Sequence, residues 1–326
     1  AYNFVAEINA ASFGLQPIEF TAEVDEWDDE WNGNAANGTA IHNLDELKAA
    51  LAAGGSYALV NDLAIDADET LVVAAGKNVT LDLYSHTITA ESDQTGSNRN
   101  LFDVRGTLTI ISTSNALSRT STDGDIVYEH KGTNMGWGNS TNLFNVTAGG
   151  VLNLSGITAK NLGGSDMAYV VDMVNATNIT VNINNSTLET PYIPIRVFNN
   201  SKTGVNNVTI KNSTLKGKYC FWVQYWLADG RSQEQLDQTL KLDIFNTEGE
   251  SNNTFVFNND YDAPVLYGFN EAVYFDEYGQ EIQLLTPIEG AEGVALDAEG
   301  NYVVTADEGI AWPAANVAEN NGFEGK

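Results

Sequence analysis

Short runs of alternating apolar and polar residues recur along the middle of the chain, each ending in a polar turn rich in Asn, Ser, Thr and Gly. The clearest copies begin at Leu81, Leu108, Leu152, Val181 and Val208, with a looser copy at Leu242. Their starting points are 27, 44, 29, 27 and 34 residues apart. An alternation with a period of two indicates strands with one buried face.

A second series of strands keeps step with the first. Its members begin at Leu101, Leu143, Val170, Ile195 and Phe221, with separations of 42, 27, 25 and 26 residues. Two series in step indicate one repeated structural unit, with insertions at roughly residues 113–142 and 227–239. One such unit cannot bury its apolar face alone, whereas units stacked at about 4.8 Å bury a continuous core.

This repeat predicts an all-β parallel β-helix. The first series should point inward and stack as one column, from Leu81 to Val208. Two asparagine pairs, Asn185 with Asn212 and Asn175 with Asn200, should also stack, and stacked amides can form a hydrogen-bonded ladder. An antiparallel sandwich is the alternative, but it needs tight two-residue hairpin turns, which are scarce between residues 70 and 250.

The stretch HNLDELKAALAAGG predicts a short capping helix at 44–53, with Asn43 as its N-cap and Gly54-Gly55 as its stop. Further on stands the phrase LDLYSHTI, Leu81 to Ile88. Together they resemble the start of the pectate-lyase-like, right-handed parallel β-helix superfamily, over about residues 41–260. The resemblance implies the fold but little about activity, because the superfamily includes lyases, hydrolases, phage tailspikes, adhesins and inert surface proteins.

The chain therefore divides into three predicted regions. Residues 1–40 form an extended acidic arm, residues 41–262 the β-helix with its capping helix, and residues 263–326 a region of β-hairpins with turns at 278–279 and 299–300. In the arm, Tyr2, Phe4 and Ile8 alternate with polar residues as in a strand, and an acidic run follows at 23–30. Such a strand can add to the sheet edge of another subunit.

Charge narrows the possible partners. Lys and Arg number 15 and Asp and Glu 44, so the formal net charge is −29. This charge repels nucleic acid and anionic membranes, and no apolar run is long enough to predict a membrane span. The single cysteine, Cys220, cannot form an internal disulfide. The start at Ala1 is what removal of a signal peptide leaves, so we expect an extracellular protein.

Catalytic patterns are weak. Arg196 is expected to be the only Arg on a repeat strand, whereas uronate lyases need several basic groups. Asp103 and Asp172 share one strand position with Asn145 between them, which predicts a separation of about 9.6 Å, just beyond the range of an inverting carboxylate pair. A polar column on a sheet face is the simpler interpretation. The three histidines, His42, His86 and His130, are too scattered in sequence to suggest one site.

Calcium is a candidate ligand without a specific motif. Oxygen-bearing side chains cluster at 66–69 and 258–262, but neither cluster has EF-hand or nonapeptide-repeat spacing. We predict no catalytic residues, no metal site and no cofactor.

The aromatic run at 219–226 is denser than a coil core needs. Phe221, Val223 and Tyr225 should share one face and Trp222 and Trp226 the other. Tyr219, Trp222, Tyr225 and Trp226 are therefore candidates for contact with a glycan or a neighbouring subunit, unless the 227–239 insertion covers them.

The sequence favours a non-enzymatic, extracellular structural or adhesive protein. It would self-associate through its N-terminal arm and C-terminal region in a surface filament, a surface layer or a virion fibre or decoration. The alternatives are a polysaccharide lyase or glycoside hydrolase and a glycan-binding module, each on the same fold.

Overall fold

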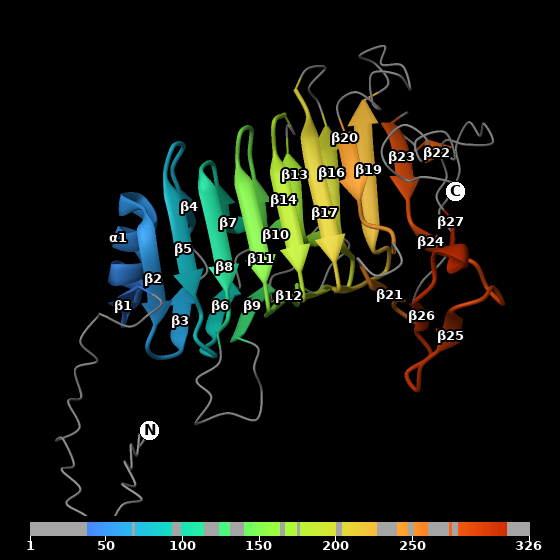
Figure 1. Cartoon of the computed structure of the whole chain (residues 1–326), viewed down its shortest axis with the longest axis horizontal. Helices are drawn as coiled ribbons and strands as arrows, with labels where there is room; N and C mark the ends of the chain where they lie inside the picture. The colour runs from blue at the N-terminus through green and yellow to red at the C-terminus, as the bar shows by residue number, and fades with distance from the viewer. Residues whose placement is uncertain are drawn as a thin grey trace, which may run out of the picture.

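The computed structural model describes residues 38–66, 69–92, 99–113, 124–130, 140–163, 167–174, 177–199, 204–226, 240–246, 251–259, 274–275 and 280–311. The arm residues Tyr2, Phe4 and Ile8, the acidic run at 23–30, Asn175 and Asn200 lie outside these ranges. Within them, strands in three long sheets line up side by side along one axis (Figure 1).

The first sheet contains eight strands, each parallel to its neighbours. In spatial order they are β1 (Thr39–Ile41), β2 (Gly55–Leu59), β5 (Asn78–Asp82), β8 (Thr107–Ile111), β11 (Val151–Ser155), β14 (Thr180–Asn184), β17 (Asn206–Lys211) and β20 (Leu240–Asp243). Sequence order and spatial order coincide, so each pass of the chain adds one strand to the growing end of this sheet.

The second sheet begins with β4 (Leu71–Val73), β7 (Arg99–Val104), β10 (Thr141–Val146), β13 (Ala168–Val174), β16 (Ile193–Asn199) and β19 (Phe221–Trp226), all parallel. Two antiparallel strands follow, β23 (Gln280–Leu284) and β22 (Tyr274–Phe275).

The third sheet begins with β3 (Leu63–Asp66), β6 (Ile88–Ser92), β9 (Gly124–His130), β12 (Ile157–Asn161), β15 (Thr187–Glu189), β18 (Thr214–Gly217) and β21 (Thr254–Phe257). The antiparallel strands β26 (Tyr302–Val304) and β25 (Val294–Leu296) follow. A separate short pair joins β24 (Thr286–Pro287) to β27 (Ile310–Ala311).

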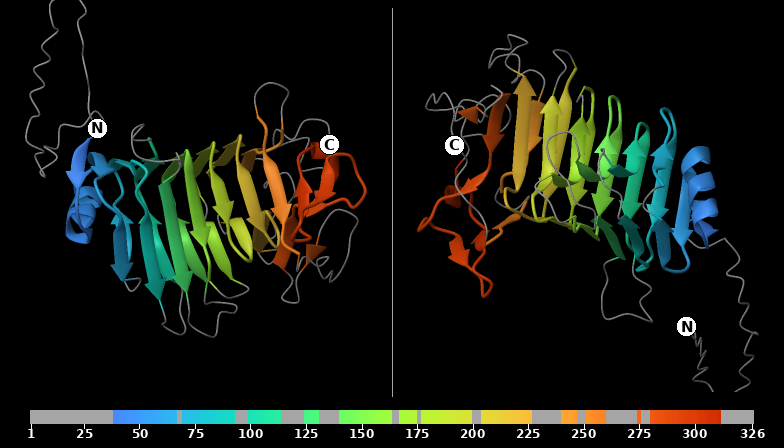
Figure 2. Two further views of the ribbon diagram at one scale, coloured as in Figure 1. Left: turned by 90° about the horizontal axis from the view of Figure 1, so that it is seen from below. Right: turned by 180° about the vertical axis from the view of Figure 1, so that it is seen from behind.

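Each repeat contributes one strand to each of the three sheets, so the strands form rungs stacked along the long axis (Figure 2). The prediction of an all-β fold with stacked parallel strands is confirmed, and the arrangement is compatible with a parallel β-helix. Parallel pairing from β1 to β21 also contradicts the antiparallel-sandwich alternative.

The predicted inward column is wrong at its first member. Leu108 pairs with Val79, and Leu81 pairs with Ile110 in the next column. From Leu108 onward the predicted column holds, through Leu152, Val181 and Val208. A shift by two residues keeps the same side chains on the buried face, so the hydrophobic pattern alone could not reveal the error. Both columns are fully buried, and the stacked rings of Phe102 and Phe144, 5.2 Å apart, fill the core beside the second sheet.

Turns between the first and third sheets explain the asparagine column. Asn185 and Asn212 have φ angles of 47° and 51°, and Gly156 stands one rung earlier with φ 67°. Asn and Gly enter this left-handed region at the least cost, so the column reflects backbone conformation. An amide ladder is found on the first sheet instead and runs from strand to strand: Asn153 donates to Thr109 (3.0 Å) and Asn182 donates to Asn153 (2.8 Å).

The predicted helix is present as α1 (Leu44–Ala53), at the N-terminal end of the stack. The Asn43 side chain accepts from the Glu46 N–H at 3.0 Å, and Gly54, with φ 83°, follows the last turn. Leu47 and Leu51 are buried against the end of the core, where α1 contacts β4 and β3.

Candidate functional site

A column of polar side chains crosses the second sheet, one residue per strand. Its members, in strand order from β7 to β19, are Asp103, Asn145, Asp172, Arg196 and Trp222. Their strand neighbours, such as Phe102, Phe144 and Phe221, belong to the main core. The prediction that Asp103 and Asp172 stand two rungs apart with Asn145 between them is confirmed.

The strongest contact in this column joins β13 to β16. Arg196 donates from Nε to Asp172 Oδ1 at 2.8 Å and from Nη2 to Asp172 Oδ2 at 2.7 Å, and both residues are buried. This two-point geometry is the strongest form of a carboxylate–guanidinium contact. Burial alone lowers the pKa of Arg196, but the Asp172 carboxylate outweighs it, so the net pKa is raised and the guanidinium stays charged.

Aromatic rings complete the surroundings of Arg196. Its guanidinium carbon lies 4.2 Å from the centre of the Tyr169 ring and 5.4 Å from that of Phe198, within the range of cation–π contacts. Burial raises the pKa of the Tyr169 phenol, which keeps it neutral. The arginine is therefore held by a carboxylate in its plane and by ring faces, an arrangement suited to structural support.

Asp103 is also buried, at the β7 end of the column, but it is held differently. Its Oδ2 accepts from Arg105 Nε at 2.8 Å and also from Nη2, and its Oδ1 accepts from Asn145 Nδ2 at 3.2 Å. The Arg105 side chain is 56% exposed. A carboxylate that accepts from a cation and an amide in the resting state is poorly placed to act as a general base. The described contacts thus favour a structural polar column.

Sequence reasoning missed three members of this neighbourhood. Arg105 stands two residues after Asp103, and residues spaced by two on a strand lie on the same face. The sequence could therefore have predicted their contact. The expectation that Arg196 is the only Arg on a repeat strand is wrong, because Arg99 begins β7. Asn142 donates to Asn100 at 2.7 Å, and its own buried Oδ1 has no hydrogen-bond partner among the described residues.

The aromatic candidates on β19 and just before it fall into two groups. Tyr219 and Trp222 are buried in a second apolar cluster outside the main core, with Met167, Tyr169, Ile193 and Leu284. Trp222 packs edge to face against Tyr192, with ring centres 5.8 Å apart. Trp222 does lie on the face opposite Phe221 and Val223, as the alternation predicts, but its ring is too covered to stack on a sugar. The side chains of Tyr225 and Trp226 lie outside the described part, so their contact role stays a prediction.

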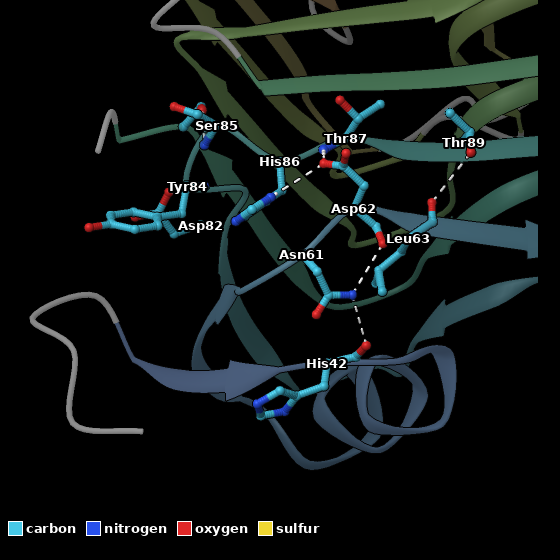
Figure 3. Close-up of polar contacts among 11 residues, drawn as sticks. His42, Asn61, Asp62, Leu63, Asp82, Tyr84, Ser85, His86, Thr87 and Thr89 are labelled. Atoms are coloured by element: carbon cyan, nitrogen blue, oxygen red, sulfur yellow. Dashed lines mark hydrogen bonds and ion pairs between the residues drawn. The ribbon is translucent and has the colours of Figure 1, made fainter. Parts of the chain in front are cut away.

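A second polar cluster lies at the N-terminal end, where Figure 3 shows two of the histidines near one loop. Both histidines contact this loop, but His42 does so through its backbone oxygen and His86 through its imidazole, so the contacts do not bring the two rings to one site. The loop residue Asn61 donates to the backbone oxygen of His42 at 3.0 Å, and Asp62 Oδ1 lies 3.3 Å from His86 Nδ1. The same Asp62 oxygen accepts from the Thr87 N–H at 2.8 Å. The side chain of His130 lies outside the described part.

Each histidine faces a carboxylate of its own. His42 Nδ1 lies 2.9 Å from Glu46 Oε2, which also accepts from the His42 N–H at 2.7 Å. These hydrogen bonds lower the pKa of Glu46, although its side chain is exposed. The bond from the His42 backbone has the largest effect. The His42–Glu46 pair is local to the start of α1, whereas Asp62 joins the 61–62 loop to the turn after β5. The loop is joined to the segment before α1 by the contact from Asn61 to the His42 backbone.

The calcium candidates gain no support from the described atoms. Glu69 forms an ion pair with Lys48 at 2.6 Å, and the amide groups of Asn258 and Asn259 donate to the backbone oxygens of Pro191 and Glu299. Residues 67–68 and 260–262 lie outside the described part. Among the residues that are described, three or more His, Cys, Asp or Glu side chains nowhere gather as a metal site requires.

Comparisons with known proteins found no matching family model, curated protein or solved structure. The resemblance to the pectate-lyase-like superfamily therefore stays a prediction. In the described part of the chain, α1 and the other helical segments are too short and too polar to cross a membrane.

Proposed function

We propose that this chain is a non-enzymatic, extracellular structural or adhesive protein that self-associates into a filament or layer on a cell or virion surface. In this proposal the stack is a right-handed parallel β-helix. The helix α1 caps its N-terminal end, and the antiparallel strands after β21 cap its C-terminal end. The pectate-lyase-like superfamily includes proteins of this kind.

One observation supports the proposal more than any other: the first sheet ends in strands that no described strand covers. β1 and β20 are its two edge strands, whereas α1 contacts β3 and β4, and antiparallel strands follow β19 and β21. An uncovered strand edge offers N–H and C=O groups to another chain. Two such edges at opposite ends of one molecule favour head-to-tail contacts, which do not close and therefore generate fibres.

Deleting residues 1–20 tests the proposal. The truncated chain should keep its far-UV circular dichroism and its melting temperature, because the described core begins at residue 38. It should no longer form the polymers that the full chain forms, as measured by light scattering and negative-stain microscopy. Unchanged polymers after the deletion rule out the arm as the connector, and a full chain that stays monomeric under all conditions refutes self-association.

The non-enzymatic part of the proposal has its own test. Pectin, alginate and related uronates should show neither β-elimination nor hydrolysis when incubated with the full chain. Variants of Asp172 and Arg196 serve as the control for any turnover that is observed. These two residues form the charged pair of the polar column, so they are the residues a catalytic site on this sheet would use. Robust turnover that disappears in Asp172→Asn or Arg196→Ala would make the column an active site and overturn the proposal.

A further inference from the structure

The outer face of the first sheet carries almost no charge. Its strands β8, β11, β14 and β17 lie side by side, and each alternates between buried residues and three residues that face outward (Figure 1). At these outward positions the side chains are Thr, Asn, Ser, Val and Ile, apart from Lys211, which pairs with Asp243 at 3.6 Å. On β5, one rung earlier, Asp82 stands in line with Ile111, but it is buried and accepts from two backbone N–H groups at 2.9 Å.

The other two sheets are charged on their outer faces. The third sheet presents Lys160, Glu189 and Lys216 in one row, joined by ion pairs of 3.8 and 3.0 Å. The second sheet presents the polar column, in which Asp172 and Arg196 are buried. The four strands from β8 to β17 therefore form a partly exposed, uncharged sheet face on a chain whose net charge is −29.

The middle row of this face is held in place by the amide ladder. Asn182 donates to Asn153 Oδ1, and Asn153 donates to Thr109 Oγ1. Each amide nitrogen has a second hydrogen and each amide oxygen a second lone pair, so the ladder can still bond a ligand. Because neighbouring side chains already fix one another, a ligand does not have to order them, which lowers the cost of binding. The row meets a new strand about every 4.8 Å.

Apolar side chains flank the ladder on both sides. Ile111 stands two residues after Thr109 on β8, and Val151 stands two residues before Asn153 on β11, so both face outward with the ladder. Both side chains are partly exposed. The face thus combines a line of ordered donors and acceptors with apolar surface beside it, a combination typical of small-molecule and sugar sites. A sugar ring matches it, because its hydroxyl groups lie at the edge and its C–H groups on the two faces.

Charge and repeat distance narrow the class of ligand. Polyanions and a second copy of the chain are repelled by the net charge of −29. Cationic partners gain nothing from a neutral face, and an added peptide strand bonds to a sheet edge, not to a sheet face. An uncharged polysaccharide satisfies both conditions, because its hydroxyl groups need no counter-charge and its rings repeat at a distance similar to the strand spacing.

We propose that the outer face of the first sheet binds an uncharged polysaccharide whose chain runs along the stack, perpendicular to the strands. Thr109, Asn153 and Asn182 bond successive sugar rings, while Val151 and Ile111 contact the C–H faces of the rings. This assignment rests on the adhesive form of the proposed function, for which it names the class of ligand, and it does not depend on self-association.

Co-sedimentation with insoluble polysaccharides tests the proposal. The full chain is kept below the concentration at which light scattering detects polymers. It is then mixed with cellulose, chitin, β-1,3-glucan and mannan as uncharged probes and with calcium alginate as the anionic probe. It should bind at least one uncharged probe, and raising the salt concentration should leave this binding nearly unchanged, because no ion pair contributes to it.

Variants on two faces of the same rungs locate the site. Asn153→Ala with Asn182→Ala removes the ladder from β11 and β14 and should weaken binding about tenfold, the equivalent of one to two hydrogen bonds. The matched control is Thr158→Ala with Thr187→Ala, which alters paired outward side chains on β12 and β15 and should leave binding unchanged. Thr109→Val keeps the shape of the side chain and removes only its hydroxyl group, so it should weaken binding several-fold without a loss of melting temperature.

The outcomes separate this proposal from self-association. Absence of binding to every uncharged probe, or equal binding by the ladder variants and the unaltered chain, overturns this face as a glycan site and leaves self-association as it stands. Binding that needs the anionic probe, or that disappears at high salt, overturns the uncharged class of ligand. Loss of polymers in the ladder variants, with no glycan bound by the unaltered chain, assigns the face to contact between copies instead. A chain that binds a probe but never polymerises refutes self-association alone.

Discussion

Removing only one partner of the buried ion pair between β13 and β16 should strongly destabilise the protein. In Arg196→Met, the fully buried Asp172 carboxylate loses both of its guanidinium donors, at 2.8 and 2.7 Å. Removing one partner of such a pair costs about 3–5 kcal/mol, because the other charge stays buried without compensation. We expect the same range for Asp172→Leu, which leaves the guanidinium between the rings of Tyr169 and Phe198 without its counter-charge.

The double variant Asp172→Leu with Arg196→Met removes both charges at once. Replacing a buried pair by apolar side chains of similar volume is often neutral, so the double variant should lie within about 2 kcal/mol of the unaltered chain. The matched control is Asp103→Asn in the same column. Its Arg105 partner is largely exposed, so it should cost about 1 kcal/mol or less.

The assay is urea unfolding at low protein concentration, followed by circular dichroism, with the free energy of unfolding extrapolated to water. The decisive comparison is between the double variant and each single variant, because coupled residues give non-additive effects. If the double variant costs as much as the two single variants added together, the pair is not coupled and the structural interpretation of the column fails.

Four further predictions concern other parts of the fold. Asn185→Ala should cost about 1 kcal/mol in urea unfolding, because φ is 47°, while Asn185→Gly should be nearly neutral. Asn43→Ala should destabilise α1 by about 1 kcal/mol, measured by hydrogen exchange of its amides. Because the pKa of Glu46 is lowered in the folded state, its contribution is present above the unfolded pKa of about 4.3 and is lost as the pH falls through the folded value; Glu46→Gln should abolish that dependence. Burial raises the pKa of the Cys220 thiol, so a thiol reagent at mildly alkaline pH should label it only after urea is added, and labelling of the native chain would contradict this burial.

The fold was largely predictable because its determinants are local and repeated. Alternation marks each strand, and the constant spacing between copies requires parallel stacking. The error at Leu81 has a physical cause: the true partner of Leu108 is Val79, two residues earlier, and both choices bury the same face. The spacing from Val79 to Leu108 is 108 − 79 = 29 residues, and both 29 and the predicted 27 occur among the later copies, so the spacing could not reveal the error either.

The polar column was predictable as a column but not as a set of contacts. Equal strand positions place Asp103, Asn145 and Asp172 on successive rungs, so spacing sufficed. The two-point contact with Arg196 depends on rotamers and on the rings around it, which no repeat pattern encodes. The link between His42 and His86 depends on the path of the 61–62 loop between sheets, and loops are the part of a repeat that the periodicity leaves open.

The charge pattern and the sheet edges favour the same mode of association. A net charge of −29 makes two copies repel each other when they meet side to side, which opposes lateral aggregation of an elongated molecule with long sheets. The C-terminal end of the stack is acidic as well, because the described residues 280–311 contain seven Asp and Glu and no Lys or Arg. Charge therefore does not distinguish the two ends, and the edges of β1 and β20, which no described strand pairs, offer main-chain groups to another chain. Repulsion between the long sides together with pairing at strand edges would favour growth in a line, which agrees with the proposed self-association.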